Sequence, residues 1–427
     1  MKIILIGPAH PYRGGLASYN ERLARALMDA GHSVTIYTFT LQYPGFLFPG
    51  KTQFSSSPPP QGLDIRRKIN SINPLNWMRV GHELRKAKPD LLLYKYWLPF
   101  MGPCFAKIAA ITKRNRHTKA IAILDNLIPH EKRTGDKLFT KWFVKRMDGF
   151  VAQSQSVLDD LVGLLSAPKS TVIANETKWS EAIPSTDADS EIASPHSLRE
   201  SNDKTIQWRD KAALLSPHPL FDNFGSIIPK EEAKKLLGLD PNFGYVLFFG
   251  FIRAYKGLDL LLEAWADERI ANLPLKLLIA GEYYESADKY KKLISDLNLS
   301  DRVIERNAFI ADEEVHKYFS ASDLLVQPYR HATQSGVAQI GYHFNKPMIV
   351  TNVGGLPEIV PHNKVGYVVK VDPRDIADHI VKFYSERKEA EFSANAAEEK
   401  KKYSWEKMVD GIERVYGAAT GAFGRAS

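Results

Sequence analysis

Two cations stand close together in the second half of the chain. Arg253 and Lys256 follow a strongly apolar run, YVLFFGFI, and precede Gly257 and a helical pattern. In a parallel α/β sheet such a loop lies at the carboxyl end of a strand, where ligands bind. Two neighbouring cations before a helix suit a diphosphate, whose charge is spread over several oxygens. A solvated surface pair is the competing interpretation, and the position after a buried strand disfavours it.

A second candidate site is HATQSGVAQIGYHFNKPMIV, residues 331–350, which contains neither Asp nor Glu. Ser335, Gly336 and Val337 stand where a helix is expected to begin. Free backbone N–H groups there can hold a phosphate without help from carboxylates. The flanking Gln334 and Gln339 are uncharged side chains that both donate and accept hydrogen bonds. We therefore predict an anion-binding turn with amide side chains around it.

A glycine loop follows the first apolar run of the chain. In GPAHPYRGGLASYNE, Gly14 and Gly15 precede a helical pattern and would let the backbone approach a phosphate or sugar closely. The spacing is not the dinucleotide-binding fingerprint. A simple turn explains these glycines equally well.

A carboxylate and a histidine follow a later apolar run, in ILDNLIPHEKR. Asp125 could orient a bound hydroxyl group or take a partial proton from it, and a turn-capping Asp is as good an explanation. His130 is an acceptor-side candidate, although an ordinary loop histidine is the simpler interpretation.

The elements that must position these residues alternate between apolar runs and helical patterns. Runs of this kind occur in two series, from KIILIG to DGFVAQS and from YVLFFGFI to GYVV. A chain of 427 residues exceeds the size of one core, so we predict two doubly wound Rossmann-like α/β domains. The predicted boundaries are 1–167 for the first domain, 168–211 for a flexible polar insertion, 212–402 for the second domain, 403–420 for a last helix, and 421–427 for a disordered tail.

The overall charge favours an anionic partner. The formal net charge is +8, which suits a nucleotide, a nucleic acid or an acidic membrane surface. No basic–aromatic motif supports nucleic-acid binding. The segment KLFTKWFVKR, residues 137–146, fits contact with an anionic membrane and fits an ordinary amphipathic helix as well. The single Cys104 excludes an intrachain disulfide and suits a cytoplasmic protein, with possible attachment to the inner membrane face.

Several motifs together resemble family 4 glycosyltransferases of the GT-B fold. They are FGFIRAYKGLDLLLEA, LLIAGE, NKPMIVTNVGGLPEIV and YSWEKM, with RGGLASYNERLARAL in the first domain. The resemblance implies transfer of a sugar from a nucleotide diphosphate, with retention of anomeric configuration and without a metal ion or other cofactor. It assigns Arg253 and Lys256 to the diphosphate, Gly15 to the facing domain, and Phe309 and Ile310 to the base. It also implies that the two domains face a cleft, with the acceptor on the first domain and the nucleotide sugar on the second. The last helix would cross back onto the first domain.

The chain departs from the family pattern where two glutamates, separated by seven residues, usually contact the donor sugar and ribose. Counting back from Pro347, these positions hold Ala332 and Ile340, and the glycine of the following turn becomes Asn345. Gln334 and Gln339 are the predicted substitutes. In the acceptor loop, Asp125–Asn126 replaces the usual His–Asp or His–Asn pair.

The leading hypothesis is a hexosyltransferase-type enzyme that builds a surface polysaccharide or glycolipid from a nucleotide-diphosphate sugar and a glycan or lipid-linked acceptor. The missing glutamates motivate an alternative, a non-catalytic nucleotide-sugar-binding partner. A sugar-nucleotide epimerase of the same architecture is disfavoured, because the anion-binding turn supplies no acid or base. The acidic DAD, residues 187–189, lies in the polar insertion and is interpreted as solvated rather than as a metal site.

Overall fold

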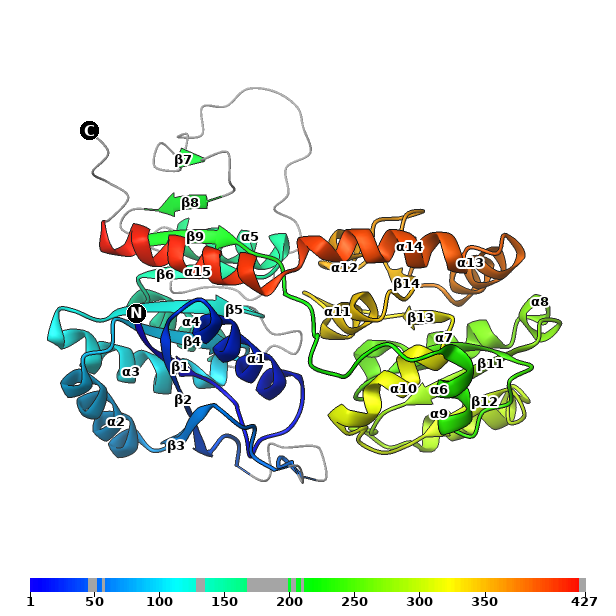
Figure 1. Cartoon of the computed structure of the whole chain (residues 1–427), viewed down its shortest axis with the longest axis horizontal. Coiled ribbons are helices and arrows are strands. Elements are labelled where there is room, and N and C mark those ends of the chain that lie inside the picture. The colour runs from blue at the N-terminus through cyan, green and yellow to red at the C-terminus, as the bar shows by residue number, and fades with distance from the viewer. Residues whose placement is uncertain are drawn as a thin grey trace.

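The structure is a computed structural model that describes residues 1–44, 52–55, 58–127, 135–166, 199–200, 205–208 and 211–421. Two α/β domains lie side by side, each built on its own largely parallel sheet (Figure 1). The predicted fold class is therefore confirmed.

The first sheet has the strand order β3-β2-β1-β4-β5-β6-β9-β8-β7. The strands from β3 to β9 run parallel, and β8 and β7 add an antiparallel extension. Central strands such as β4 are buried along their whole length, as expected for a sheet covered on both faces. The strands are β1 Lys2–Ile6, β2 Ser33–Leu41, β3 Asp64–Asn70, β4 Leu91–Tyr96, β5 Lys119–Leu124, β6 Gly149–Ala152, β7 Arg199–Glu200, β8 Thr205–Trp208 and β9 Lys211–Leu215.

Five helices accompany this sheet, and each buries an apolar stripe. In α1, Leu23 and Leu27 lie four residues apart on one face and are fully buried. Burial of each such side chain contributes about 1.5–3 kcal/mol. The helices are α1 Gly15–Asp29, α2 Pro74–Ala87, α3 Gly102–Thr112, α4 Asp136–Arg146 and α5 Gln155–Ser166.

The second sheet has six parallel strands in the order β12-β11-β10-β13-β14-β15, the doubly wound pattern with its switch point between β10 and β13. Each strand falls within a run of the second series, and all of these runs are apolar except that of β12, which has the sequence VIER. The strands are β10 Gly244–Phe249, β11 Leu275–Ala280, β12 Val303–Arg306, β13 Leu324–Gln327, β14 Met348–Thr351 and β15 Gly366–Val369. The helices are α6 Lys230–Leu236, α7 Leu258–Trp265, α8 Glu268–Ala271, α9 Asp288–Asp296, α10 Val315–Ala321, α11 Gly336–His343, α12 Leu356–Ile359, α13 Pro373–Ser385, α14 Glu389–Glu399 and α15 Trp405–Thr420.

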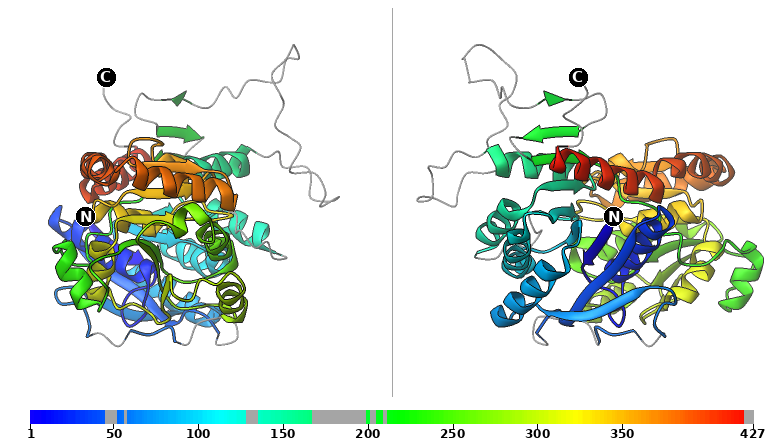
Figure 2. Two further views of the ribbon diagram at one scale, coloured as in Figure 1. Left: turned by 90° about the vertical axis from the view of Figure 1, so that its right-hand side faces the viewer. Right: turned by 60° about the vertical axis from the view of Figure 1, so that its left-hand side comes forward.

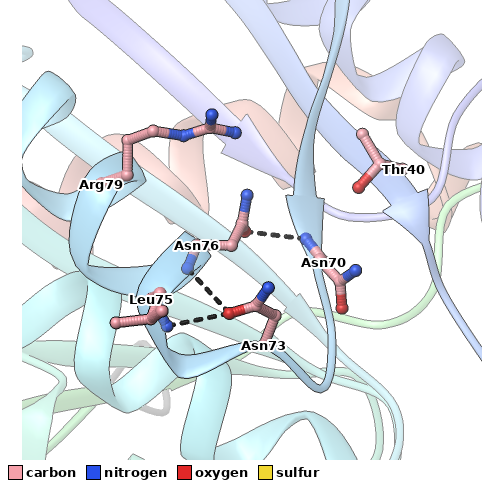
Figure 3. A pocket seen from close by; sticks show the side chains of 6 residues that line it. All are labelled: Thr40, Asn70, Asn73, Leu75, Asn76 and Arg79. Carbon is pink, nitrogen blue, oxygen red and sulfur yellow. Dashed lines mark hydrogen bonds between the residues drawn. The ribbon is translucent and has the colours of Figure 1, made fainter.

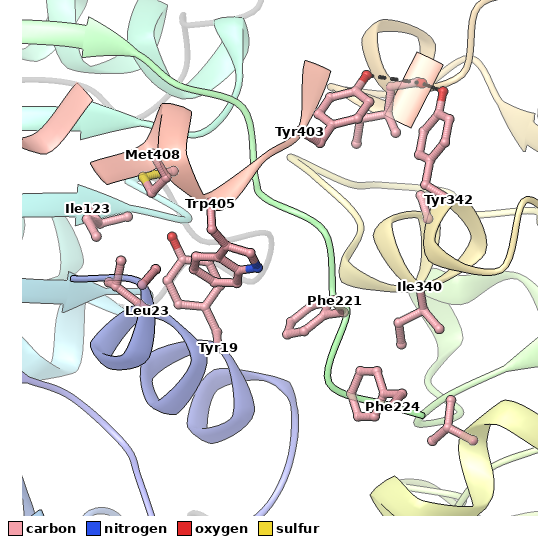
Figure 4. Packing of buried hydrophobic residues seen from close by; sticks show 14 of the residues in the cluster. Tyr19, Leu23, Ile123, Phe221, Phe224, Ile340, Tyr342, Tyr403, Trp405 and Met408 are labelled. Carbon is pink, nitrogen blue, oxygen red and sulfur yellow. Dashed lines mark hydrogen bonds between the residues drawn. The ribbon is translucent and has the colours of Figure 1, made fainter. Parts of the chain in front are cut away.

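The chain crosses between the domains twice, and the two crossings are bonded together. The Leu220 amide donates to the Tyr403 carbonyl, and the Trp405 indole donates to the Leu220 carbonyl, each at 2.9 Å. Beyond this point α15 packs on α1, β5, β6 and β9 of the first domain (Figures 1 and 2). Figure 4 shows Trp405 against Tyr19, with ring centroids 5.2 Å apart. Aromatic packing and hydrogen bonds thus join the two domains where the chain crosses between them.

Two expected boundaries need correction. β9 pairs parallel with β6, with Gly149 opposite Ala212, so the first sheet extends through Leu215 and the second domain does not begin at residue 212. The last part of the predicted 168–211 insertion also forms strands β7 and β8 and the start of β9. The apolar AALL of β9 supplies the physical reason, since it buries against α15. The remainder of that insertion and residues 422–427 lie outside the described residues.

Candidate active site

The turn after β10 presents the two cations predicted from the sequence. Arg253 is followed by a single 3₁₀ turn, η4 Ala254–Lys256, and Gly257 then adopts a φ of 66°. A Cβ on Gly257 would lie 2.0 Å from the Pro328 carbonyl oxygen, so only glycine fits there. This close approach of the turn to the β13 loop fixes the direction in which Lys256 points.

The ammonium of Lys256 is a buried cation without a counter-ion. Its residue is 8% exposed, and no carboxylate in the described part of the chain forms an ion pair with it. Burial, and secondarily repulsion from Arg253, lower the pKa of Lys256 to about 7. A buried unpaired charge is costly, and an anion bound beside it would remove that cost. The site is therefore built for an anionic ligand.

The guanidinium of Arg253 lies beside the same turn. It stacks over the Tyr284 ring, with 5.0 Å between its Cζ and the ring centroid, and is half-buried. Among the described carboxylates none forms an ion pair with Arg253 either. Two cations facing one region concentrate positive potential there.

The turn at residues 335–337, predicted to bind an anion, begins α11 and lies next to these cations. Ser335 is the N-cap of α11, and its hydroxyl accepts from the Ala338 amide at 3.2 Å and donates to the Gln327 side chain. The Gly336 and Val337 amides, at the first positions of the helix, have no partner within it. A Cβ on Gly250 would lie 3.0 Å from the Lys256 Nζ and 3.5 Å from Val337 Cγ2. The helix end and the cations thus flank the same small space.

Gln339 is fully buried on α11, and both its amide atoms lack a hydrogen-bond partner. Leaving such atoms unpaired costs about 1–3 kcal/mol, which a bound polar ligand would offset. Ala332 and Ile340, where counting back from Pro347 places the family glutamates, are buried apolar residues. Gln339, one residue before Ile340, is thus the unpaired polar side chain closest in sequence to the missing second glutamate.

The acceptor-side residue Asp125 meets the donor loop across the domain junction. The Gln334 side chain donates to the Gln153 amide oxygen at 3.3 Å, and its proximity opposes the rise in the pKa of Asp125 that burial causes. Beside it, the Thr333 hydroxyl donates to Asn126. The structure therefore brings Gln334 and Asp125 together, as a shared site requires.

Lys95 is the principal site residue that the sequence analysis missed. Its Nζ lies 2.6 Å from Asp125 Oδ1, and the two side chains are 1% and 8% exposed. Burial raises the pKa of Asp125, and Lys95 opposes that rise. A lysine inside the otherwise apolar strand LLLYKY was the available signal, because charged residues are rarely buried without a partner.

The residues expected near the base form an aromatic patch. The Phe309 ring stacks on Phe251 at 6.1 Å, and Phe251 in turn lies 4.3 Å from Tyr284. The Arg13 guanidinium covers the Phe309 ring at 4.2 Å. Because Arg13 covers one face of the Phe309 ring, the backbone of Phe309 is better placed than the ring to contact a ligand. The same holds for the backbone of Ile310, which is half-buried beside it.

The first-domain glycine loop lies against the second domain and the linker. Gly14 adopts a φ of 97°, and a Cβ there would lie 3.7 Å from Phe251 of the second domain. A Cβ on Gly15 would lie 3.7 Å from Phe221 of the linker. Gly14 therefore faces the second domain and Gly15 faces the linker, whereas His130 falls outside the described residues.

A cavity of about 370 Å³ lies at the carboxyl ends of β2 and β3 (Figure 3). The Asn70 side-chain oxygen accepts from the Ile72 amide, and that of Asn73 from the Leu75 and Asn76 amides. The side-chain groups left without a partner are donors, the Asn70 and Asn73 NH₂ groups and the Arg79 guanidinium. The cavity is lined by Thr40, Asn70, Asn73, Leu75, Asn76 and Arg79.

Two further observations concern the described part of the chain alone. No group of three or more His, Cys, Asp or Glu side chains is arranged there to hold a metal ion. No helix in it is both long and apolar enough to cross a membrane.

Comparisons with solved structures agree on the fold. A sucrose-phosphate synthase from Thermosynechococcus elongatus superimposes with a TM-score of 0.69 at 16% identity, over 99% of this chain and 100% of that one. Anabaena HepE in complex with UDP gives a TM-score of 0.68 at 16% identity, over 98% and 100% of the two chains. At these identities the likeness establishes the GT-B arrangement of the two domains and nothing finer.

Comparisons of sequence identify each domain. An uncharacterized glycosyltransferase of Methanocaldococcus jannaschii is 32% identical over 186 residues, 43% of this chain and 50% of the relative. A D-inositol 3-phosphate glycosyltransferase of Rhodococcus opacus is 32% identical over 203 residues, 45% and 44% of the two chains. The chain thus spans about half the length of the curated relatives it matches. Residues 13–175 match the model for Glycosyltransferase Family 4, and residues 229–403 match that for Glycosyl transferases group 1. The chain therefore carries the two domains of a family 4, group 1 glycosyltransferase on a GT-B fold.

Proposed function

We propose that this protein is a retaining, metal-independent glycosyltransferase of hexosyltransferase type. It moves a sugar from a nucleotide-diphosphate donor onto a glycan or glycolipid acceptor in the synthesis of a surface polysaccharide. The observation that carries the proposal is the buried, unpaired ammonium of Lys256 beside Arg253 and the α11 N-terminus.

The chemistry follows from the charge that grows on the leaving group. Breaking the bond between the sugar and the diphosphate places negative charge on the diphosphate oxygens, and preorganised positive groups stabilise that charge. A helix N-terminus contributes about 0.3–1 kcal/mol, or up to about 2 when partly buried. Lys256 and Arg253 supply the larger part, in the role that a metal ion plays in other enzymes.

The donor side supports a nucleoside diphosphate sugar. Solved relatives of the same fold are complexes with UDP and with UDP-glucose. In this chain the backbone of Phe309 and Ile310 would contact the base, while the unpaired amide of Gln339 would bond the ribose. Gln334, at the domain junction, would contact the sugar. The donor loop therefore replaces the usual carboxylates with amides.

The acceptor side supports a ligand that carries an anionic group. Asp125 would accept the proton of the attacking hydroxyl. The cavity beside Arg79 offers only hydrogen-bond donors from its free side chains, which suits a phosphate or carboxylate. Relatives named for D-inositol 3-phosphate act on an acceptor of that class. We expect Arg79→Ala to raise the KM for an anionic acceptor, whereas Arg85→Ala, an exposed change later in α2, leaves it unchanged; equal KM values would contradict this assignment.

Peripheral contact with an anionic membrane is part of the proposal. Helix α4 buries Phe143 and Val144 but leaves Leu138 67% and Trp142 39% exposed among lysines. Exposed apolar side chains flanked by cations suit a cytoplasmic lipid surface. Sedimentation with anionic vesicles tests this contact. Equal binding by wild type and a Leu138→Ser/Trp142→Ser variant would contradict it.

The function is tested in two steps: the donor is identified first, and the anomeric configuration of the product is determined afterwards. Thermal-shift screening against UDP-, GDP- and ADP-sugars identifies a ligand, because binding stabilises the fold by mass action. The identified donor is then incubated with candidate acceptors, with and without EDTA, and the product linkage is assigned by NMR. Transfer with retention, insensitive to EDTA, is expected; inversion or loss of activity with EDTA would contradict the mechanism.

The apolar Ala332 and Ile340 favour a second candidate, a non-catalytic nucleotide-sugar-binding partner in a glycan-assembly complex. Binding of a donor without hydrolysis or transfer for any acceptor would support it. Formation of an epimer without acceptor would instead indicate the epimerase that shares this architecture.

A further inference from the structure

We propose that Lys95 is a positioning residue that holds Asp125 ionised in one orientation and joins it to the donor loop of the second domain. The inference rests on the proposed function, because it assigns Asp125 the acceptor hydroxyl. It adds a residue that lies in the interior of β4 and touches neither substrate.

Three buried side chains surround the ammonium of Lys95. Its ammonium lies 2.6 Å from Asp125 Oδ1, 3.0 Å from the Gln153 side-chain oxygen and 3.3 Å from the centroid of the Tyr19 ring. The Gln153 amide nitrogen donates to the Tyr19 hydroxyl at 2.7 Å. The ammonium, which β4 carries, is thus surrounded by residues that come from α1 and from immediately after β5 and β6.

Gln334 of the second domain contacts this group. Gln334, the residue before the N-cap of α11, donates to the same Gln153 oxygen that Lys95 bonds, and its proximity opposes the rise in the pKa of Asp125. The donor loop and the acceptor carboxylate therefore share partners. A shift of the donor loop changes the surroundings of Asp125, and Lys95 keeps the carboxylate in place while that occurs.

Stability alone does not account for such a pair. Replacing a buried ion pair by apolar residues of similar volume is often neutral or stabilising, whereas removing one partner costs about 3–5 kcal/mol. The adjoining core is apolar, since every other residue of β4 is uncharged and buried. A buried lysine is needed at this point if the carboxylate of Asp125 must remain charged, because the ammonium stabilises that charge.

Two further titratable groups face the pair and bear on its pH dependence. His218, from the linker, lies 4.9 Å from the Tyr19 ring, and burial lowers its pKa to about 3, so it is neutral near pH 7. Burial also raises the pKa of Tyr19 far above its usual range. Both are uncharged at neutral pH, so Lys95 is the only charge in the described surroundings that offsets Asp125.

The experiment compares Lys95→Met, Lys95→Arg and the double variant Lys95→Met/Asp125→Asn with a matched control, Lys346→Met. Lys346 is likewise a buried lysine, bonded to the Ser322 carbonyl at 2.7 Å in the second domain. The first readout is the pH profile of kcat for transfer. The second is the infrared carboxyl band of ¹³C-aspartate protein, assigned to Asp125 by its absence from Asp125→Asn. This readout needs no activity.

Lys95→Met is expected to lose about 10²–10⁴-fold in kcat at pH 7, the contribution typical of a positioned acid or base. Activity should recover as pH rises, and the infrared band should show protonated Asp125 at pH 7. Lys95→Arg should keep the wild-type pH profile even where kcat is lower, and the double variant should fold with near wild-type stability. Lys346→Met should show the wild-type profile.

An ionised Asp125 in Lys95→Met at pH 7, or a pH profile that moves equally in Lys346→Met, would overturn the inference. A wild-type protein that transfers no sugar from any donor, while its Asp125 becomes protonated on loss of Lys95, would refute the proposed function and leave the Lys95–Asp125 coupling established. The two failures are therefore distinguishable.

Discussion

Arg13 and Glu282 join the two domains through a buried ion pair, with 2.7 Å between Nη2 and Oε2. Their side chains are 10% and 5% exposed, and the same guanidinium covers the Phe309 ring. Arg13 belongs to the glycine loop after β1, and Glu282 follows β11. The pair therefore holds the first-domain loop against the region where the base would bind.

Breaking this pair should loosen the closed arrangement and weaken donor binding. Arg13→Ala leaves the buried Glu282 charge unpaired, so a loss of about 3–5 kcal/mol in the free energy of unfolding is expected, together with a raised KM for the donor. Denaturant unfolding and steady-state kinetics measure the two effects. Arg22→Ala is the matched control, because Arg22 pairs with Asp222 of the linker at 2.7 Å but is more exposed and should contribute about 0–1 kcal/mol. Equal effects of the two changes would contradict this role for Arg13.

Nucleotide binding should depend on pH through Lys256. In the free protein its pKa is about 7, below the ordinary lysine value. An anion bound alongside raises that pKa, so above pH 7 binding must recruit a proton, and affinity should fall by up to about tenfold per pH unit. Below pH 7 the ammonium is already charged, and affinity should level off. Calorimetry in buffers of different ionisation enthalpy should detect the proton uptake. Binding of UDP with no proton uptake at pH 8 would be inconsistent with this coupling.

The unpaired amide of Gln339 predicts opposite effects on stability and binding. Gln339→Leu removes two unpaired buried atoms, so the free energy of unfolding should be unchanged or should rise by up to about 1–3 kcal/mol. Donor affinity should fall because the ribose contact is lost. Thermal unfolding with and without the donor measures both quantities. A variant that is destabilised and binds the donor normally would show that Gln339 has a structural role instead.

Much of the fold could be predicted because the buried strands are continuous apolar runs. Five strands of the second sheet and most of the first sheet are visible in this way, whereas β12, with the sequence VIER, is a half-buried edge strand. β3 was not predicted, because its sequence, DIRRKIN, is mostly charged. It is an edge strand of the sheet, with β2 as its neighbour. The boundary at residue 212 was misplaced because nothing local shows that β9 pairs with β6 rather than beginning a new sheet.

The site could be predicted only where its residues are adjacent in sequence. Arg253 and Lys256, and the turn at Ser335, depend on local geometry that glycines and a helix cap make visible. The pairing of Lys95 with Asp125, and of Arg13 with Glu282, joins residues from different strands or domains. Such pairs depend on tertiary packing, which no spacing rule in the chain encodes.

The central claim is that Lys256 binds the donor diphosphate, and thermal unfolding of wild type and Lys256→Met against UDP-, GDP- and ADP-sugars tests it most directly. Lys256→Met removes a buried unpaired charge, so the unliganded variant should unfold at or above the wild-type temperature. One nucleotide-sugar series should raise the Tm of wild type by several degrees and leave that of Lys256→Met nearly unchanged. An equal rise in both proteins would contradict the assignment of Lys256.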